Sequence, residues 1–226
     1  MTHEPKAVIW DVDGTLIDSG NAHWQSWRVI FQQEGYADID YATFISWFGR
    51  RNEEILREHF GVDVTDEFID RLAETKEAHY REGLRLEPTP ILPGVNDWLE
   101  RLAADGWELG IGSSAATLNL EIILAQSGWT ERFGAVVARE DVRVGKPDPE
   151  VYLTAAAQLG VDPSRAIVIE DAAAGVLGAH RAGMRTIGVG THHSELGAMI
   201  SVPSLDLLAV DAFDALLAQP LPVGIS

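Results

Sequence analysis

The chain has 226 residues, of which 46% are hydrophobic, so it can bury a sizeable core in one large domain or in one domain with an insertion. Asp and Glu number 35 against 17 Lys and Arg, and the net charge of −18 disfavours nucleic acid and anionic membranes as partners. The absence of cysteine excludes disulfides, thiolate catalysis and cysteine-bound metal centres. No run approaches the roughly eighteen apolar residues of a membrane span, and no signal peptide is recognisable, so we expect a cytoplasmic protein.

The first expected element is a short buried strand over residues 7–10, which leads directly into the sequence Asp-Val-Asp-Gly-Thr. Alternate residues of an extended segment point the same way, so Asp11 and Asp13 present their carboxylates together. Gly14 permits a sharp turn, which places both acids at the carboxyl end of the strand, where open α/β sheets bind ligands. A turn that merely caps the strand explains the same residues, so the pair alone leaves both interpretations open.

Helical spacing of apolar residues follows, and no strand pattern interrupts it. The expected helices cover residues 21–33, 40–48, 51–60 and 65–84. The segment from residue 19 to residue 87 is therefore predicted to be an all-helical insertion after the first strand. A helical insertion beside a site at a strand end is a candidate lid.

From Pro88 onward, strand and helix signals alternate to the end of the chain. The expected strands are 107–113, 135–138, 166–170 and 185–190, and the expected helices are 95–104, 116–127, 149–159 and 172–182. The tail from residue 203 is expected to add one short strand and a last helix near 211–218.

This alternation predicts an α/β fold. Its core is expected to be a Rossmann-like, doubly wound parallel sheet with crossover helices, formed by residues 1–18 and 88–226. The all-helical cap domain, residues 19–87, is inserted into this core.

Two later loops carry groups that suit an anion. The second expected strand ends in Ser113 and Ser114 and opens a helix, so hydroxyls and unpaired backbone N–H groups meet there, although a helix N-cap explains the serines equally well. Lys146 lies between Gly and Pro147, which favours extended backbone before it, and Pro149 suits the first position of a helix. A lysine held by stiff neighbours is useful where an anion binds, and a solvated loop lysine is the plain alternative.

A second acidic pair, Glu170 and Asp171, ends the strand expected at 166–170. The carboxyl ends of parallel strands meet at one edge of a sheet, so four carboxylates would converge and repel by a few kcal/mol per close pair at an effective dielectric constant of ~20. A divalent cation would turn this repulsion into ligation, and hard oxygen ligands without His or Cys suit Mg²⁺. The sequence therefore predicts a Mg²⁺ site at this edge.

Taken in order, the acidic pair, the serine turn, the lysine loop and the second acidic pair resemble the motifs of the haloacid dehalogenase (HAD) superfamily of phosphatases and phosphomutases. The sequence is more closely similar to the branch of β-phosphoglucomutase, which carries a small helical cap after the first motif. The resemblance spans nearly the whole chain, from residues 11–16 through 145–149 to 169–171. The first motif is moderately specific, and all four in order are highly specific.

The resemblance implies chemistry through an aspartyl phosphate. Asp11 is expected to be the nucleophile and Asp13 the general acid and base, while Ser113 and Lys146 are expected to hold the phosphoryl oxygens. The implied Mg²⁺ ligands are Asp11, the Asp13 carbonyl and Asp171, with Glu170 beside them. The implied substrate-binding residues are Gly14, Thr15, His23, Trp24, Gly49, Arg50, Asn52 and Ser114.

Members of this family select the leaving group with the cap, and His23 matches a histidine of the mutase-like branch. Mutases of this kind carry a lysine before the cap glycine and an arginine a few residues after it, where this chain has Phe48 and Asn52. Without this basic pair, a second phosphate on the substrate would be held less well, which favours a phosphatase over a mutase. Arg50 or Arg51 could compensate for the missing positive charge.

The expected function is hydrolysis of a small phosphorylated metabolite, such as a sugar phosphate, by a monomer or weak homodimer. The alternative is a β-phosphoglucomutase-like isomerase. A dehalogenase has no need of Asp13, and a phosphonatase would require Lys76, the one lysine of the cap, as an imine-forming amine. Residues 110–115 fit a dinucleotide-binding fingerprint, which leaves both acidic pairs unexplained. A noncatalytic phosphometabolite-binding protein of the same fold would usually lack a motif residue, and every motif residue is present.

Overall fold

The structure, a computed structural model, describes residues 4–47, 50, 52–61 and 64–221. The chain forms two compact units. One is an α/β unit made of Met1–Asp18 and Pro90–Ser226, and the other is a helical unit, Ser19–Thr89.

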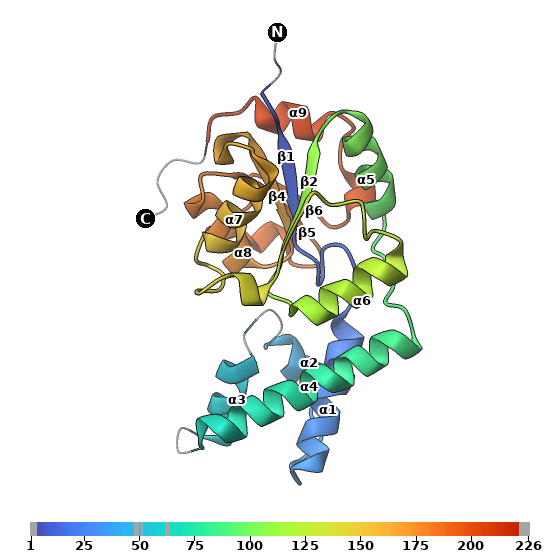
Figure 1. Cartoon of the computed structure of the whole chain (residues 1–226), viewed down its shortest axis with the longest axis vertical. Helices are drawn as coiled ribbons and strands as arrows, with labels where there is room; N and C mark the ends of the chain where they lie inside the picture. The colour runs from blue at the N-terminus through green and yellow to red at the C-terminus, as the bar shows by residue number, and fades with distance from the viewer. Residues whose placement is uncertain (1–3, 48–49, 51, 62–63, 222–226) are drawn as a thin grey trace. The chain divides into compact units, whose positions relative to one another are not determined.

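The α/β unit is built on a parallel sheet (Figure 1). The order of its strands in the described residues is β3-β2-β1-β4-β5-β6. The strand β1 is central, because Ile9 pairs with Gly110 of β2 on one side and with Val168 of β4 on the other. This sheet with its crossover helices confirms the predicted Rossmann-like α/β fold class. The strands are β1 (Ala7–Trp10), β2 (Glu108–Gly112), β3 (Ala135–Val137), β4 (Ala166–Glu170), β5 (Arg185–Val189) and β6 (Ile200–Val202).

The last strand differs from its expected position. Its three residues, Ile200–Val202, end just before the tail in which the sequence analysis placed a short strand. Within the described part of the chain it pairs with β5 alone. The strand is short and partly exposed, so it lacks the buried apolar run that makes a strand recognisable in the sequence.

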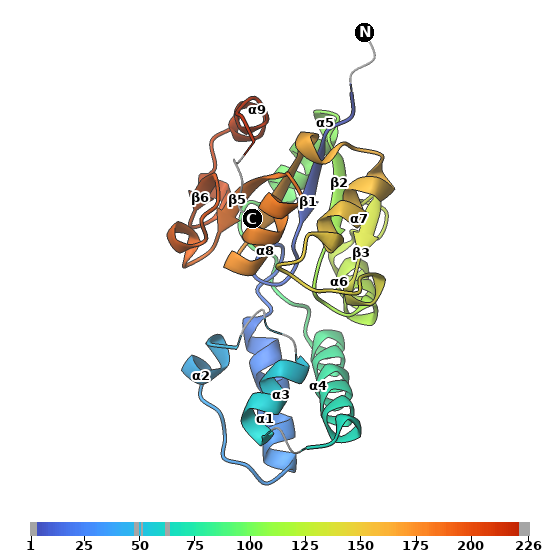
Figure 2. The same cartoon turned by 90° about the vertical axis from the view of Figure 1, so that its left-hand side faces the viewer.

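Helices cover both faces of the sheet, which Figure 1 views nearly edge-on and Figure 2 views onto the face covered by α7 and α8. The helices α7 (Glu150–Leu159) and α8 (Ala173–Arg181) pack on one face, and α5 (Val95–Ala104) and α9 (Ala212–Leu217) pack on the other. The helix α6 (Thr117–Ser127) connects β2 to β3, and 3₁₀ turns occupy Arg139–Asp141, Pro163–Arg165, His193–Glu195 and Leu205–Leu207.

The helical unit contains α1 (Gly20–Gln33), α2 (Tyr41–Ile45), α3 (Asn52–Phe60) and α4 (Asp66–Leu86). Its apolar core is rich in aromatic rings, and Trp27, Phe31 and Phe44 are each at most 2% exposed. The Thr65 hydroxyl accepts a hydrogen bond from the Phe68 N–H and caps the first turn of α4. None of the helices in the described part of the chain has the length and apolar character needed to cross a membrane.

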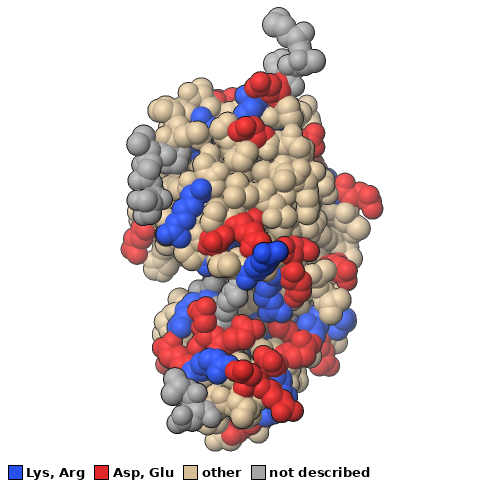
Figure 3. All heavy atoms as spheres, turned by 60° about the vertical axis from the view of Figure 1, so that its left-hand side comes forward, with Lys and Arg blue, Asp and Glu red and all other residues tan. Residues whose placement is uncertain are grey.

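Acidic and basic side chains lie next to one another on the face shown in Figure 3. Several arginines of the helical unit are paired with carboxylates. Arg28 contacts Asp38 at 2.6 Å and Arg50 contacts Glu58 at 2.6 Å. Carboxylates thus lie beside these basic groups, on a chain in which acidic residues outnumber basic ones and the net charge is −18.

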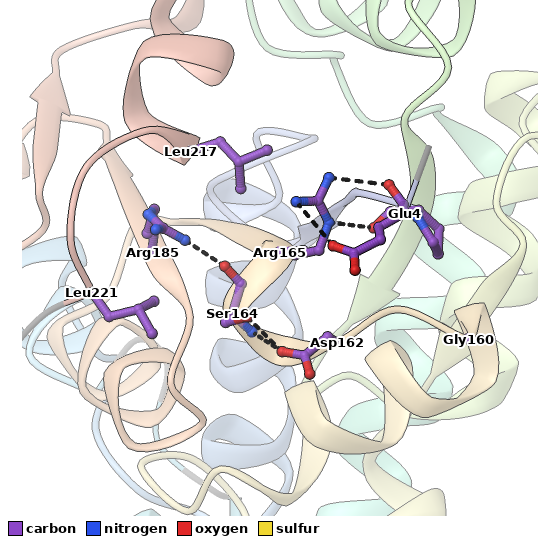
Figure 4. A pocket seen from close by; sticks show the side chains of 9 residues that line it. Glu4, Gly160, Asp162, Ser164, Arg165, Arg185, Leu217 and Leu221 are labelled. Atoms are coloured by element: carbon purple, nitrogen blue, oxygen red, sulfur yellow. Dashed lines mark hydrogen bonds and ion pairs between the residues drawn. The ribbon is translucent and has the colours of Figure 1, made fainter. Parts of the chain in front are cut away.

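A hollow of about 630 Å³ lies at the amino-terminal edge of the sheet (Figure 4). It is formed by the segments that precede β1 and β4, by the start of β5 and by the end of α9 with the residues that follow it. Arg185 lines it with a buried side chain, which donates hydrogen bonds to the backbone carbonyls of Gln219 and Ser164. Arg165 donates to two carbonyls just before β1, both at 3.0 Å. The two guanidinium groups therefore link the first and last described segments of the chain to the sheet.

Replacing Arg185 with Met should lower the free energy of unfolding by about 2 kcal/mol, because hydrogen bonds from a charged donor contribute roughly 1.5–3 kcal/mol and the carbonyls of Gln219 and Ser164 would lose this donor. Urea denaturation measures the change. Arg143→Met, at an exposed position, is the matched control and should stay within about 0.5 kcal/mol of the original protein. Equal losses of unfolding free energy in the two variants would show that the hydrogen bonds of Arg185 do not stabilise the fold.

Candidate active site

Three carboxylates meet at the opposite, carboxyl-terminal edge of the sheet. Asp11 directly follows β1, and its N–H donates to the Ile169 carbonyl at 3.0 Å, which extends the pairing of β1 with β4 by one residue. Glu170 is the last residue of β4 and Asp171 follows it. Each of the three acids offers an oxygen, and these oxygens all lie within 4.8 Å of one another. The two acidic motifs therefore meet at the edge where parallel strands place them.

The turn after Asp11 brings the chain close to Asp171. Asp13 forms an isolated bridge with Ile17, and the Gly14 N–H donates to the Ile17 carbonyl at 2.9 Å. Gly14 has a φ of +82°, and a Cβ added there would lie 2.0 Å from an Asp171 carboxylate oxygen. Glycine is thus required for both the backbone conformation and the space that the carboxylate occupies.

Lys146 joins the two acidic motifs. Its Nζ donates to Oδ1 of Asp11 at 2.6 Å and to Oε1 of Glu170 at 2.7 Å. The same Glu170 oxygen accepts a hydrogen bond from the Tyr152 hydroxyl at 2.7 Å, and its other oxygen accepts from the Ala172 N–H at 3.0 Å. The lysine ammonium group is thereby held against the carboxylate expected to be the nucleophile.

Burial shifts the pKa values of the acids and of the lysine at this edge of the sheet. It raises the pKa of Asp11 to about 7, with Lys146 opposing the rise and the charge of Glu170 adding to it. Burial, followed by the charges of Glu170 and Asp11, also raises the pKa of Asp171 well above its ordinary value. Burial alone would lower the pKa of Lys146, but Asp11 and Glu170 outweigh it and raise that pKa. One ammonium group is therefore shared among several acids that resist ionising together.

The donor set fits a hard divalent cation. It consists of carboxylate oxygens without His or Cys, and ionisation of Asp11 and Asp171 is disfavoured until further positive charge arrives. A bound Mg²⁺ would supply that charge, and the close spacing of the oxygens of Asp11, Glu170 and Asp171 suits shared coordination.

The serines and the threonine lie near the same edge with different exposure. Ser113 follows β2 and is buried, and its Oγ accepts a hydrogen bond from the Ala115 N–H at 3.1 Å. Ser114 is exposed. The Thr15 hydroxyl is fully buried and has no hydrogen-bond partner among the described residues. The described residues therefore supply no hydrogen-bond partner to this polar group at the edge of the sheet.

Two of the expected substrate-binding residues, His23 and Asn52, belong to a polar cluster within the helical unit. We use this name for His23, Asn52, Lys76 and Glu77. The Lys76 Nζ lies 2.8 Å from Nδ1 of His23 and 2.9 Å from Oε1 of Glu77, which also accepts from Nδ2 of Asn52 at 2.7 Å. Because Lys76 is ion-paired, it is poorly suited to the imine chemistry of a phosphonatase.

The other expected cap residues make contacts inside the helical unit. The Trp24 indole N–H donates to the Ile39 carbonyl at 3.0 Å, and Arg50 is paired with Glu58. Gly49 lies outside the described residues, as do Phe48 and Arg51. Structural roles therefore account for the contacts of Trp24 and Arg50, and their expected roles in substrate binding stay predictions.

Sequence reasoning missed two features of the polar groups. Tyr152 reads as a core residue of a helix, and nothing in the spacing of apolar residues reveals its contact with Glu170. The pairing of Lys76 with Glu77 was also missed, because neighbouring residues on a helix ordinarily point in different directions. The available signal for this pairing was the position of Lys76, which falls among apolar residues in the helical pattern of α4.

Comparison with known proteins matches residues 8–189 to the family model of haloacid dehalogenase-like hydrolases. The β-phosphoglucomutase of Bacillus subtilis (strain 168) is 34% identical over 204 residues, 87% of this chain and 88% of that protein. Validoxylamine A 7′-phosphate phosphatase of Streptomyces hygroscopicus subsp. limoneus is 32% identical over 188 residues, 83% of this chain and 87% of that protein. The crystal structure of β-phosphoglucomutase from Clostridium difficile has a TM-score of 0.84 at 27% identity and covers 94% of this chain and 97% of its own. The chain therefore belongs to the haloacid dehalogenase-like hydrolase family, in its β-phosphoglucomutase-like branch.

Proposed function

We propose that this protein is a Mg²⁺-dependent phosphatase that hydrolyses a small phosphorylated metabolite, a sugar phosphate, through a covalent intermediate on Asp11. The observation that carries the proposal is the Lys146 ammonium group, 2.6 Å from Asp11 and 2.7 Å from Glu170, at an edge that also holds Asp171. The names of the two relatives above support a phosphorylated small molecule as substrate.

In the first step, a carboxylate oxygen of Asp11 attacks phosphorus while the bond from phosphorus to the leaving oxygen breaks. Asp13 donates its proton to that oxygen, which leaves as an alcohol. In the second step, Asp13 takes a proton from water as the water oxygen attacks the aspartyl phosphate. The bond from phosphorus to Asp11 breaks, inorganic phosphate is released, and both carboxyl groups return to their initial state.

Charge stabilisation accompanies both steps. Lys146 and Ser113 would bind the phosphoryl oxygens, and the Asp11, Asp13 carbonyl and Asp171 oxygens would hold Mg²⁺ with Glu170 beside them. When bound, the ion supplies positive charge to the phosphoryl group and to the acids around it. Phosphate monoester hydrolysis requires accelerations of up to ~10²¹, so positioning and charge stabilisation must together supply over ~20 kcal/mol.

The helical unit is proposed to act as the cap that selects the leaving group. The polar cluster supports this role, because His23 and Asn52 are among its members and its hydrogen-bonding groups suit substrate hydroxyls. A mutase is the second candidate, favoured by the 34% identity to a β-phosphoglucomutase. Asn52 argues against it, since its amide is already bonded to Glu77 and carries no charge for a second phosphate.

The proposal predicts metal-dependent release of inorganic phosphate from members of a panel of sugar phosphates, nucleotides and β-glucose 1-phosphate. Formation of glucose 6-phosphate is followed in parallel with a bisphosphate activator present. We expect release without isomerisation. Isomerisation with little release would establish the mutase, and inactivity in both assays with intact fold would favour a noncatalytic binding protein.

Replacing Asp11 with Asn should abolish turnover, because an amide is a poor nucleophile, whereas Asp13→Asn should lower kcat by about 10²–10⁴-fold through loss of general acid and base catalysis. Phosphate release and circular dichroism are measured together. Asp97→Asn, at an exposed position on α5, is the matched control and should retain full activity. Normal turnover of a folded Asp11→Asn variant would disprove the nucleophile assignment.

The pKa of Asp11 predicts how metal removal changes stability. Because folding raises this pKa from 3.8 to about 7, the folded state binds the proton more tightly, and stability is lost as pH rises through that interval. With EDTA, urea denaturation should therefore show lower stability at pH 7.5 than at pH 5.5. Mg²⁺ should restore stability at pH 7.5, since it binds the ionised acids of the folded state.

Asp11→Asn provides the control for this measurement, because its uncharged amide cannot titrate. The variant should show a smaller loss of stability between pH 5.5 and 7.5 in EDTA. A pH dependence identical to that of the original protein would show that Asp11 is not the group responsible.

A further inference from the structure

The lysine of the candidate active site is supported by a residue that no step of the proposed reaction uses. We propose that Tyr152 is a positioning residue, which fixes Lys146 for phosphoryl transfer by holding the Glu170 carboxylate with its hydroxyl. This inference rests on the proposed function, because it assigns Lys146 to the phosphoryl group.

Two contacts link Tyr152 to the reacting groups. Its hydroxyl lies 2.7 Å from the Glu170 oxygen that also accepts from Lys146, and the Lys146 Nζ lies 5.2 Å from the centroid of its ring. An ionised carboxylate can only accept hydrogen bonds, so the tyrosine donates. The ring face attracts the same ammonium group that the carboxylate binds. Tyr152 therefore contacts both partners of the ion pair.

The ring cannot move without displacing its neighbours. Tyr152 is fully buried in α7, within the core cluster on that face of the sheet. A Cβ added at Gly112 of β2 would lie 3.1 Å from the ring, and one added at Gly178 of α8 would lie 3.4 Å from it. The ring thus fills a space between the sheet and α8 that glycines leave open, and the position of its hydroxyl is fixed by packing.

A fixed hydroxyl matters because one oxygen of Glu170 is shared. Both Lys146 and Tyr152 donate to Oε1, while the Ala172 N–H holds Oε2. Without the hydroxyl, the lysine would face that oxygen alone and would be drawn more strongly to the carboxylate. It would then be less available to the phosphoryl oxygens as their charge shifts in the transition state.

The test is Tyr152→Phe, which removes the hydroxyl and retains the ring. For a substrate from the panel that the original enzyme hydrolyses, kcat should fall about tenfold with KM changed less than about threefold, since the lost interaction acts mainly in the transition state. Inhibition by orthovanadate, which mimics the pentacoordinate phosphoryl group, should weaken more than inhibition by inorganic phosphate. The ratio of the two inhibition constants does not depend on the fraction of folded enzyme, and kcat is compared after it has been normalised to that fraction.

Ala155→Gly is the matched control, because Ala155 is fully buried in the same helix and the substitution weakens the helix without altering a polar group. It should lower the unfolding midpoint yet leave kcat and the ratio of the two inhibition constants unchanged. An unaltered kcat in Tyr152→Phe, or equal kinetic changes in both variants, would overturn the positioning role. If the original enzyme releases no phosphate from any substrate, the proposed function fails instead, and the role of Tyr152 falls with it.

Discussion

The ion pair of Lys146 with Asp11 and Glu170 is the interaction on which the candidate active site depends. It joins a loop before α7 to the ends of β1 and β4, which are neighbours in the sheet although far apart in the sequence. Buried acids so close together resist ionising, and a single ammonium group relieves only part of their repulsion. The repulsion that remains among these acids makes the site suited to a divalent cation.

Much of this arrangement follows from the sequence, because the rules for parallel sheets are strong. An acidic pair after one buried strand and another after a later strand must meet if the strands are parallel neighbours, and Asp11, Glu170 and Asp171 do. The Rossmann-like sheet was predictable for the same reason. The edge strand β6 was misplaced, since three partly exposed residues carry too little pattern to locate.

Polar contacts among buried side chains were the part that sequence could not supply. Helical periodicity shows that Tyr152 faces the core, but not that its hydroxyl reaches Glu170 across the sheet edge. Similarly, Lys76 and Glu77 are adjacent in the sequence, and their shared contacts with His23 and Asn52 depend on how α1, α3 and α4 pack. Such contacts are set by side-chain conformation and tertiary packing, which leave no periodic trace in the chain.

The hydrogen bonds of Arg165 and Arg185 at the amino-terminal edge of the sheet bear on how the protein can be attached to a surface. Arg165 and Arg185 secure both ends of the described chain at the edge opposite the acidic cluster. Surface attachment or crosslinks introduced at that edge would therefore lie at the edge of the sheet away from the acids. The protein thus offers a point of immobilisation on the edge of the sheet opposite Asp11, Glu170 and Asp171.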